Sequence, residues 1–137
     1  TVKNDSTVTF VDFDTLLAES DYLSVHCPLT DATKERFDAN AFAKMKKSAY
    51  FINTARGGVI NEQALADALN GGVLAGAAVD VLTTEPMKPD CPLLHAANIT
   101  ITPHIAWAPI ETRKRLLSIV EKNIEAFLDG KPINVVN

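Results

Sequence analysis

Residues 74–86 read LAGAAVDVLTTEP, a nearly unbroken apolar run that gives way to a polar loop. Such a run predicts a strand of a parallel sheet that is covered on both faces. Similar runs occupy residues 48–53, before NTARGG, and residues 98–102, before PHIAW. Because helical segments alternate with these strands, we expect an α/β fold with right-handed crossovers and a doubly wound, Rossmann-like parallel sheet.

Other segments complete the expected order of elements. We expect further strands at residues 7–11 and 22–26, the latter stopped by Cys27-Pro28. Asp14, Asp38 and Asn61 are the expected caps of helices that end near residues 20, 46 and 69. The predicted inward-facing residues of the first two helices are Leu16, Leu17, Phe42 and Met45.

The longest predicted helix begins at Pro109 and ends near Asp129. Its apolar residues recur at helical spacing, which predicts one apolar stripe along the helix. The stripe comprises Ile110, Leu117, Val120, Ile124, Phe127 and Leu128.

Composition excludes several classes of function. The chain has 137 residues, 47% of them apolar and 22% charged, as expected for one globular domain. A net charge of −4 argues against nucleic acid as a partner. No run is long enough to span a bilayer, so we expect no membrane partner. Cys27 and Cys91 stand alone, without a CxxC motif or a His at metal-ligand spacing, so we expect no metal site and a cytoplasmic location.

Arg56, Glu85 and His104 are the candidates for chemistry, because each lies at or just beyond the carboxyl end of an expected strand. Ligands of an open parallel sheet bind outside those ends. A cation, an acid and an imidazole should therefore meet at one crevice, where they could hold an acidic substrate and move a proton on it.

Each of these residues also has an ordinary interpretation. Arg56 could form a surface ion pair, Glu85 could be a solvated loop acid, and a lone His is more often structural than catalytic. A contact between Glu85 and His104 would favour catalysis, because a carboxylate fixes the tautomer of an imidazole. Asp80 could hold a polarised ring or amide, or cap a turn. Nothing nearby marks Cys27 as an activated nucleophile, so a packing role is favoured.

Four motifs together resemble the D-isomer-specific 2-hydroxyacid dehydrogenases, and they cover nearly the whole chain. They are DYLSVHCPLTDAT at 21–33, INTARGGVINEQALADAL at 52–69, LAGAAVDVLTTEP at 74–86 and NITITPHIAW at 98–107. The resemblance implies that Arg56 binds the substrate carboxylate and that Glu85 supports His104. It implies that His104 is the acid/base partner of hydride transfer at nicotinamide. Implied cofactor contacts are Cys27, Pro28, Thr33, Thr54, Ala55, Arg56, Asp80 and His104.

The HIAW sequence, which contains Trp107 as an implied substrate contact, resembles the glycerate dehydrogenase (hydroxypyruvate reductase) branch. The resemblance therefore implies NAD(H)-linked interconversion of a 2-keto acid and a D-2-hydroxy acid, with hydroxypyruvate and D-glycerate as the expected pair and a homodimer as the expected assembly. NADP stays open as the cofactor. Two alternatives remain. One is a dinucleotide-binding protein of the corepressor type. The other is the formate dehydrogenase branch, for which the resemblance implies Gln at the matching position, so Glu85 counts against it.

The chain departs from the family pattern in one respect. The Gly-rich GxGxxG turn that binds phosphates, and the acidic residue that meets the ribose, do not occur in it. The resemblance therefore implies the C-terminal part of a chain roughly twice as long, whose sheet lacks the first βαβ unit. Residues 1–106 are expected to be an incomplete NAD-binding domain. Residues 107–137 are expected to be a helix and tail that return to the substrate domain.

Overall fold

The structure is a computed structural model that describes residues 6–136. The chain divides into two compact units, one ending at His104 and the other beginning at Ile105. The first unit carries the sheet and the second carries the longest helix. The functions expected of these two parts stay predictions.

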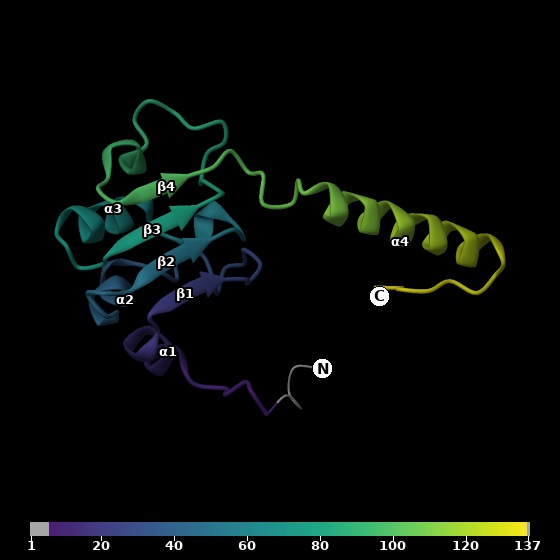
Figure 1. Cartoon of the computed structure of the whole chain (residues 1–137), viewed down its shortest axis with the longest axis horizontal. Helices are drawn as coiled ribbons and strands as arrows, with labels where there is room; N and C mark the ends of the chain where they lie inside the picture. Colours follow the sequence, from purple (N-terminus) through teal and green to yellow (C-terminus); the bar gives the residue numbers. More distant parts are fainter. Residues whose placement is uncertain (1–5, 137) are drawn as a thin grey trace. The chain divides into compact units, whose positions relative to one another are not determined.

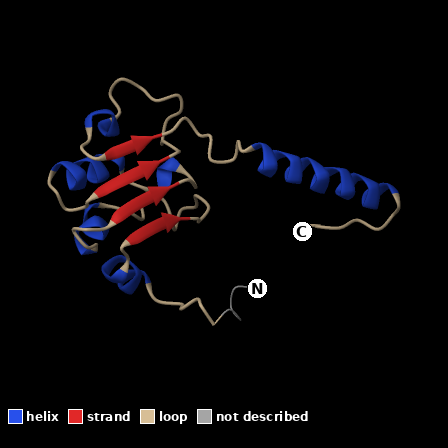
Figure 2. Cartoon of the chain, viewed as in Figure 1, coloured by secondary structure: helices blue, strands red, loops and turns tan. Residues whose placement is uncertain are grey.

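The sheet of the first unit has four strands: β1 (Tyr22–Val25), β2 (Tyr50–Asn53), β3 (Gly76–Val79) and β4 (Ile99–Ile101). They lie in the order β1-β2-β3-β4, and every neighbouring pair is parallel (Figures 1 and 2). The register aligns Val25, Asn53, Val79 and Ile101 across the sheet. This alignment confirms the α/β class and brings the loops after β2, β3 and β4 to one edge.

Three helices pack in the first unit: α1 (Phe13–Glu19), α2 (Ala39–Lys44) and α3 (Glu62–Asn70). Short 3-10 turns, η2 (Gly57–Val59) and η3 (Pro92–His95), complete it. Asp38 and Asn61 cap α2 and α3 through the amides of Ala41 and Ala64, as predicted.

The predicted cap of the first helix is wrong. Asp12 precedes α1 in an extended conformation and accepts a hydrogen bond from the Thr15 amide at 2.9 Å. Asp14 already lies in the first turn, where its carboxylate pairs with Lys44 at 2.7 Å. Hydrogen bonds of the Thr15 amide and hydroxyl hold the pKa of Asp12 below its ordinary value. The capping oxygen therefore belongs to the residue just outside the helix.

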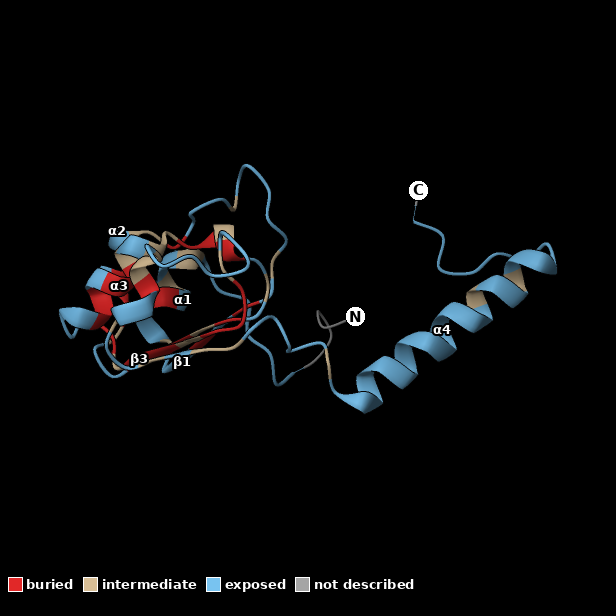
Figure 3. Cartoon of the chain, turned by 90° about the horizontal axis from the view of Figure 1, so that it is seen from above, coloured by how far each residue is buried: buried red, intermediate tan, exposed pale blue. Residues whose placement is uncertain are grey.

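The helices α1, α2 and α3 cover one face of the sheet (Figure 3). The opposite face of the sheet is open at β1 and β2. Tyr22 is 71% exposed and Tyr50 is 45% exposed, and their rings stack at 5.6 Å on the other face. Right-handed crossovers that always advance in the same direction put every connecting helix on the same side.

The core lies between that covered face and the helices. Phe42 of α2 and Phe51 of β2 are fully buried and meet edge to face at 5.3 Å. Met45 and Leu17 are buried as predicted, whereas Leu16 is 40% exposed, because α1 turns only one side toward the sheet. Residues 7–11 form no strand, contrary to the prediction: Val8, Phe10 and Val11 are exposed and pair with no neighbour in the described sheet.

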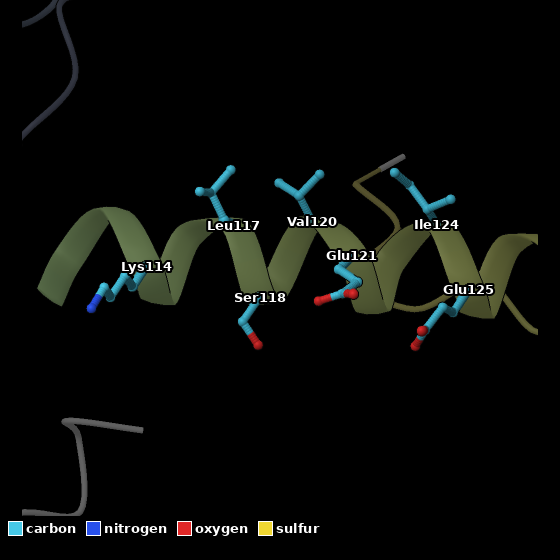
Figure 4. Close-up of a pocket in the computed structure, with 7 residues that line it drawn as sticks. All are labelled: Lys114, Leu117, Ser118, Val120, Glu121, Ile124 and Glu125. Carbon is cyan, nitrogen blue, oxygen red and sulfur yellow. The ribbon is translucent and has the colours of Figure 1, made fainter. Parts of the chain in front are cut away.

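The second unit contains α4 (Ile110–Leu128), which begins directly after Pro109 as predicted. Its side chains Leu117, Val120 and Ile124 lie along one edge as part of the expected apolar stripe, and Ser118, Glu121 and Glu125 lie beside them (Figure 4). No residue of α4 is buried by the described chain, so the hollow along this helix is an open surface. Among residues 6–136, no helix has the length and apolar character that a bilayer span needs.

Candidate active site

Glu85 and His104 meet at the carboxyl edge of the sheet. Glu85 lies in the loop after β3, and His104 lies just after β4. The imidazole Nδ1 of His104 is 2.7 Å from Oε2 of Glu85. This geometry confirms the predicted contact between the acid and the imidazole.

The loop itself orients the Glu85 carboxylate. Its second oxygen, Oε1, accepts a hydrogen bond from the Leu82 amide at 2.9 Å. The hydrogen bond from His104 and then that from Leu82 hold the pKa of Glu85 below its ordinary value, against an opposing effect of desolvation. Glu85 is therefore charged near neutral pH, and a charged carboxylate is what orients an imidazole.

The backbone of His104 joins the ends of β3 and β4. Its N–H donates to the Asp80 carbonyl at 2.9 Å, and its φ is +55°, in the left-handed region that His enters more readily than most residues. The hydroxyl of Thr102 donates to Oδ1 of Asp80 at 2.5 Å, and Asp80 is only 4% exposed. A hollow of about 550 Å³ opens beside these groups, lined by Asp80, Glu85, Met87, Thr102 and His104 among others.

Arg56 lines a neighbouring hollow of about 490 Å³, after β2. Its guanidinium Nη1 donates to the Ala55 carbonyl at 2.6 Å. Five predicted cofactor contacts share this hollow with His26 and Leu29: they are Cys27, Pro28, Thr54, Ala55 and Arg56. The structure therefore brings these five together and places Asp80 and His104 in the other hollow.

Thr33 stabilises the loop after β1, which contains Cys27 and Pro28. Its hydroxyl donates to the Pro28 carbonyl at 2.7 Å and accepts from the Thr30 amide at 2.8 Å. A bracing role for Thr33 follows from these bonds, while its predicted cofactor contact stays a prediction. Trp107 belongs to the second unit, where its ring lies 5.7 Å from the Arg113 guanidinium carbon. Its predicted substrate contact also stays a prediction.

Sequence reasoning missed two residues that shape the site. Asn53 is fully buried, and its amide side chain donates to the Arg56 carbonyl and accepts from the Ala55 amide, both at 3.0 Å. The only feature of the sequence that could have indicated a role for Asn53 is its place as a polar residue at the end of an apolar strand. Gly57 lies so close to the next loop that an added Cβ would fall 2.0 Å from the Leu82 carbonyl carbon. The turn that carries Arg56 therefore rests directly on the loop that carries Glu85.

In open parallel α/β sheets, ligands bind outside the carboxyl ends of the strands, which is where the acid–imidazole pair lies. Comparison with known proteins identifies the class. Residues 1–106 match the family described as D-isomer specific 2-hydroxyacid dehydrogenase, NAD binding domain. The chain belongs to that family, which confirms the resemblance seen in the motifs, and NAD is the cofactor of the matching domain.

Individual relatives agree with this assignment. A hydroxypyruvate reductase of Blautia hydrogenotrophica is 51% identical, over 93% of this chain and 40% of the relative. A glycerate dehydrogenase of Methylorubrum extorquens is 46% identical, over 92% of this chain and 41% of the relative. The solved D-isomer specific 2-hydroxyacid dehydrogenase of Lactobacillus delbrueckii ssp. bulgaricus, in its NAD-complexed form, superposes with a TM-score of 0.82 and 32% identity. That match covers 93% of this chain and 43% of the other. This chain thus spans about two fifths of the length of these proteins.

Proposed function

We propose that this chain is part of an NAD(H)-dependent oxidoreductase that interconverts a 2-keto acid and a D-2-hydroxy acid. The contact between Glu85 and His104 carries the proposal, because an oriented imidazole is what reduction of a carbonyl needs beside a hydride. We take hydroxypyruvate and D-glycerate as the substrate pair, supported by the names of the Blautia and Methylorubrum relatives.

The proposed roles follow the chemistry of each group. Arg56 takes the substrate carboxylate, since a guanidinium can bind both oxygens at once. His104 gives its Nε2 proton to the substrate oxygen as the alkoxide develops, and takes a proton from the hydroxyl in the reverse direction. Glu85 remains charged and holds the resulting imidazolium in place through Nδ1. Trp107 is proposed to contact the substrate.

The two hollows suit the nicotinamide half of a dinucleotide. Both open at the carboxyl edge of a parallel sheet, and their lining combines small residues such as Ala55 and Pro28 with the buried carboxylate of Asp80. When bound, the cofactor supplies or accepts the hydride. Thr54, Ala55 and Asp80 would hold it, with Thr33 bracing the loop of Cys27 and Pro28.

Four wider features belong to the same proposal: the roles of the two parts of the chain, the assembly, the location and the choice of cofactor. The match of residues 1–106 to an NAD-binding domain supports their role in holding cofactor. A role of residues 107–137 in the substrate domain is proposed on the family resemblance alone. A homodimer and a cytoplasmic location are proposed on the family resemblance and on the isolated cysteines. NAD is preferred over NADP on the description of the family domain.

The test is hydroxypyruvate-dependent oxidation of NADH by the full-length protein that contains this chain. His104→Gln should lower kcat at least about 100-fold, since general acid catalysis contributes 10²- to 10⁴-fold. His95→Gln, in the exposed turn η3, is the matched control and should keep full activity. Arg56→Lys should mainly raise KM for the keto acid, because the bidentate contact is lost. NADH binding without turnover of any 2-keto acid would instead support a corepressor-type protein.

A further inference from the structure

Glu62 is the first residue of α3, and its carboxylate reaches a loop that follows another strand. Oε1 of Glu62 accepts a hydrogen bond from the backbone N–H of Thr83 at 2.6 Å. Thr83 lies between the end of β3 and Glu85, in the loop that carries the acid of the proposed active site. This contact therefore joins the start of α3 to the loop that carries Glu85, the acid of the acid–imidazole pair.

Two successive amides of that loop donate to two different carboxylates. The Leu82 amide donates to Oε1 of Glu85 at 2.9 Å, and the Thr83 amide donates to Oε1 of Glu62 at 2.6 Å. The Leu82 N–H belongs to the peptide plane between Val81 and Leu82, and the Thr83 N–H belongs to the next plane, between Leu82 and Thr83. Rotation of the Leu82–Thr83 plane would break the bond to Glu62 and would move the start of the segment that leads to Glu85. Hydrogen bonds to a charged acceptor are about twice as strong as neutral ones, so the Glu62 contact is well suited to fix that plane.

The same segment supports the loop at a second point. Gly57, at the start of η2, lies against the carbonyl of Leu82 and the nitrogen of Thr83 so closely that a Cβ would meet them at 2.0–2.3 Å. Backbone packing at Gly57 and the hydrogen bond that Thr83 donates to Glu62 thus act on the same peptide, the one between Leu82 and Thr83. The chain between β2 and α3 therefore carries Arg56 and also holds the loop of Glu85.

We propose that Glu62 is a positioning residue, which keeps the loop of residues 82–85 in the conformation that presents Glu85 to His104. The inference rests on the proposed function only for its effect on turnover. The competing explanation is local: an acid in the first turn stabilises α3 through the helix dipole. Asn61 already caps that helix through Ala64, so the reach of Glu62 across to Thr83 is not needed for the cap.

Three substitutions separate the two explanations. Glu62→Gln keeps the length and an acceptor oxygen but removes the charge. Glu62→Asp keeps the charge in the first turn but is one methylene too short to reach Thr83. Glu62→Ala removes both. Gln63→Ala, one position along α3, is the matched control, since its side chain bonds only to Asp67 on the same helix among the contacts described.

The first measurement is hydrogen–deuterium exchange of the full-length protein containing this chain, followed in the peptides that cover residues 82–87 and 62–70. We expect the loop peptide to exchange about tenfold faster in the Asp and Ala variants, which corresponds to loss of one hydrogen bond to a charged group. The Gln variant keeps a neutral and weaker acceptor, so its loop should exchange at a rate between those of the wild type and the Asp variant. The Gln63→Ala variant should exchange at the wild-type rate. The α3 peptide should be unchanged in the Asp variant.

The second measurement is the kinetics of the same variants with hydroxypyruvate and NADH. We expect kcat to fall about tenfold in the Asp and Ala variants with little change in KM, and to fall by a smaller factor in the Gln variant, which keeps a neutral acceptor. A wild-type-like Asp variant with an impaired Gln variant would overturn the proposal in favour of the helix-dipole role. Loosening of α3 in the Asp variant would overturn it as well. If no variant turns over hydroxypyruvate, the exchange data still decide the positioning role, and only the proposed function fails.

Discussion

The imidazole of His104 and the carboxylate of Glu85 are held together at 2.7 Å, from loops that follow two neighbouring strands, β4 and β3. Glu85 also accepts the Leu82 amide, so one of its oxygens belongs to its own loop and the other to the histidine. Both side chains are partly open to solvent, at 43% and 36% exposure. The pair is therefore oriented and accessible, as a proton-transfer site requires.

The first prediction concerns pH. The pKa of Glu85 is lowered on folding from its ordinary value of 4.5, by the hydrogen bonds of His104 and Leu82. Stabilisation from the charged carboxylate is thus present above pH 4.5 and is lost as the pH falls through the lowered pKa. Glu85→Gln should reduce the free energy of unfolding near neutral pH, and its difference from wild type should shrink on acidification. Urea unfolding across this range is the measurement.

A suitable control for the pH experiment is Glu19→Gln, at the exposed end of α1, which should unfold like the wild-type protein. A difference between Glu85→Gln and wild type that grows on acidification would contradict the lowered pKa. A difference that is absent near neutral pH would show that the contact adds nothing to stability.

The second prediction tests the approach of two backbones at Gly57. A Cβ at this position would lie 2.0 Å from the Leu82 carbonyl carbon, and backbone atoms cannot move aside as a side chain can. Gly57→Ala should lower the free energy of unfolding by about 1–3 kcal/mol. Gly58→Ala is the control, because the atoms nearest to its Cβ, from 3.1 Å, belong to the exposed side chain of Leu29, which can move aside. Equal stability of the two variants in urea would refute the close contact.

The third prediction concerns the start of α3. Asn61 accepts a hydrogen bond from the Ala64 amide at 2.9 Å, so Asn61→Ala should lower the free energy of unfolding by about 1 kcal/mol. Asn61→Asp retains a capping oxygen and should unfold within a few tenths of a kcal/mol of wild type, as estimated from the similar preference of Asn and Asp at this position. Thermal unfolding in which Asp and Ala behave alike would argue against the cap.

The fourth prediction concerns the core. Phe42 is fully buried between Phe37 and Phe51, so Phe42→Ala removes its packing and leaves a cavity. We expect a loss of about 3–5 kcal/mol in the free energy of unfolding. Phe10→Ala changes a ring that is 65% exposed and should alter stability by less than about 0.5 kcal/mol. A small change in the free energy of unfolding for Phe42→Ala would show that Phe42 is not part of the hydrophobic core.

Local pattern was sufficient for much of the fold. The strands β1 to β4 were predicted because buried apolar runs ended at turn residues, and Asp38 and Asn61 were recognised because a cap bonds within its own helix turn. Residues 7–11 show the limit of this reasoning. Their β-branched and aromatic side chains suit a strand, but a strand exists only where a neighbour pairs with it, and none does in the described sheet.

By itself, then, the sequence determined the α/β class, the family and the placement of Arg56, Glu85 and His104 after successive parallel strands, because these depend on order along the chain. Tertiary structure alone decided which face the helices cover and how the site is supported. The donors to Glu85 and Glu62 are the backbone N–H groups of Leu82 and Thr83. Every residue except Pro has such a group, so no sequence pattern identifies these two as donors. Strand register and the packing of Gly57 on Leu82 bring these groups within reach, and both arise only when distant segments fold together.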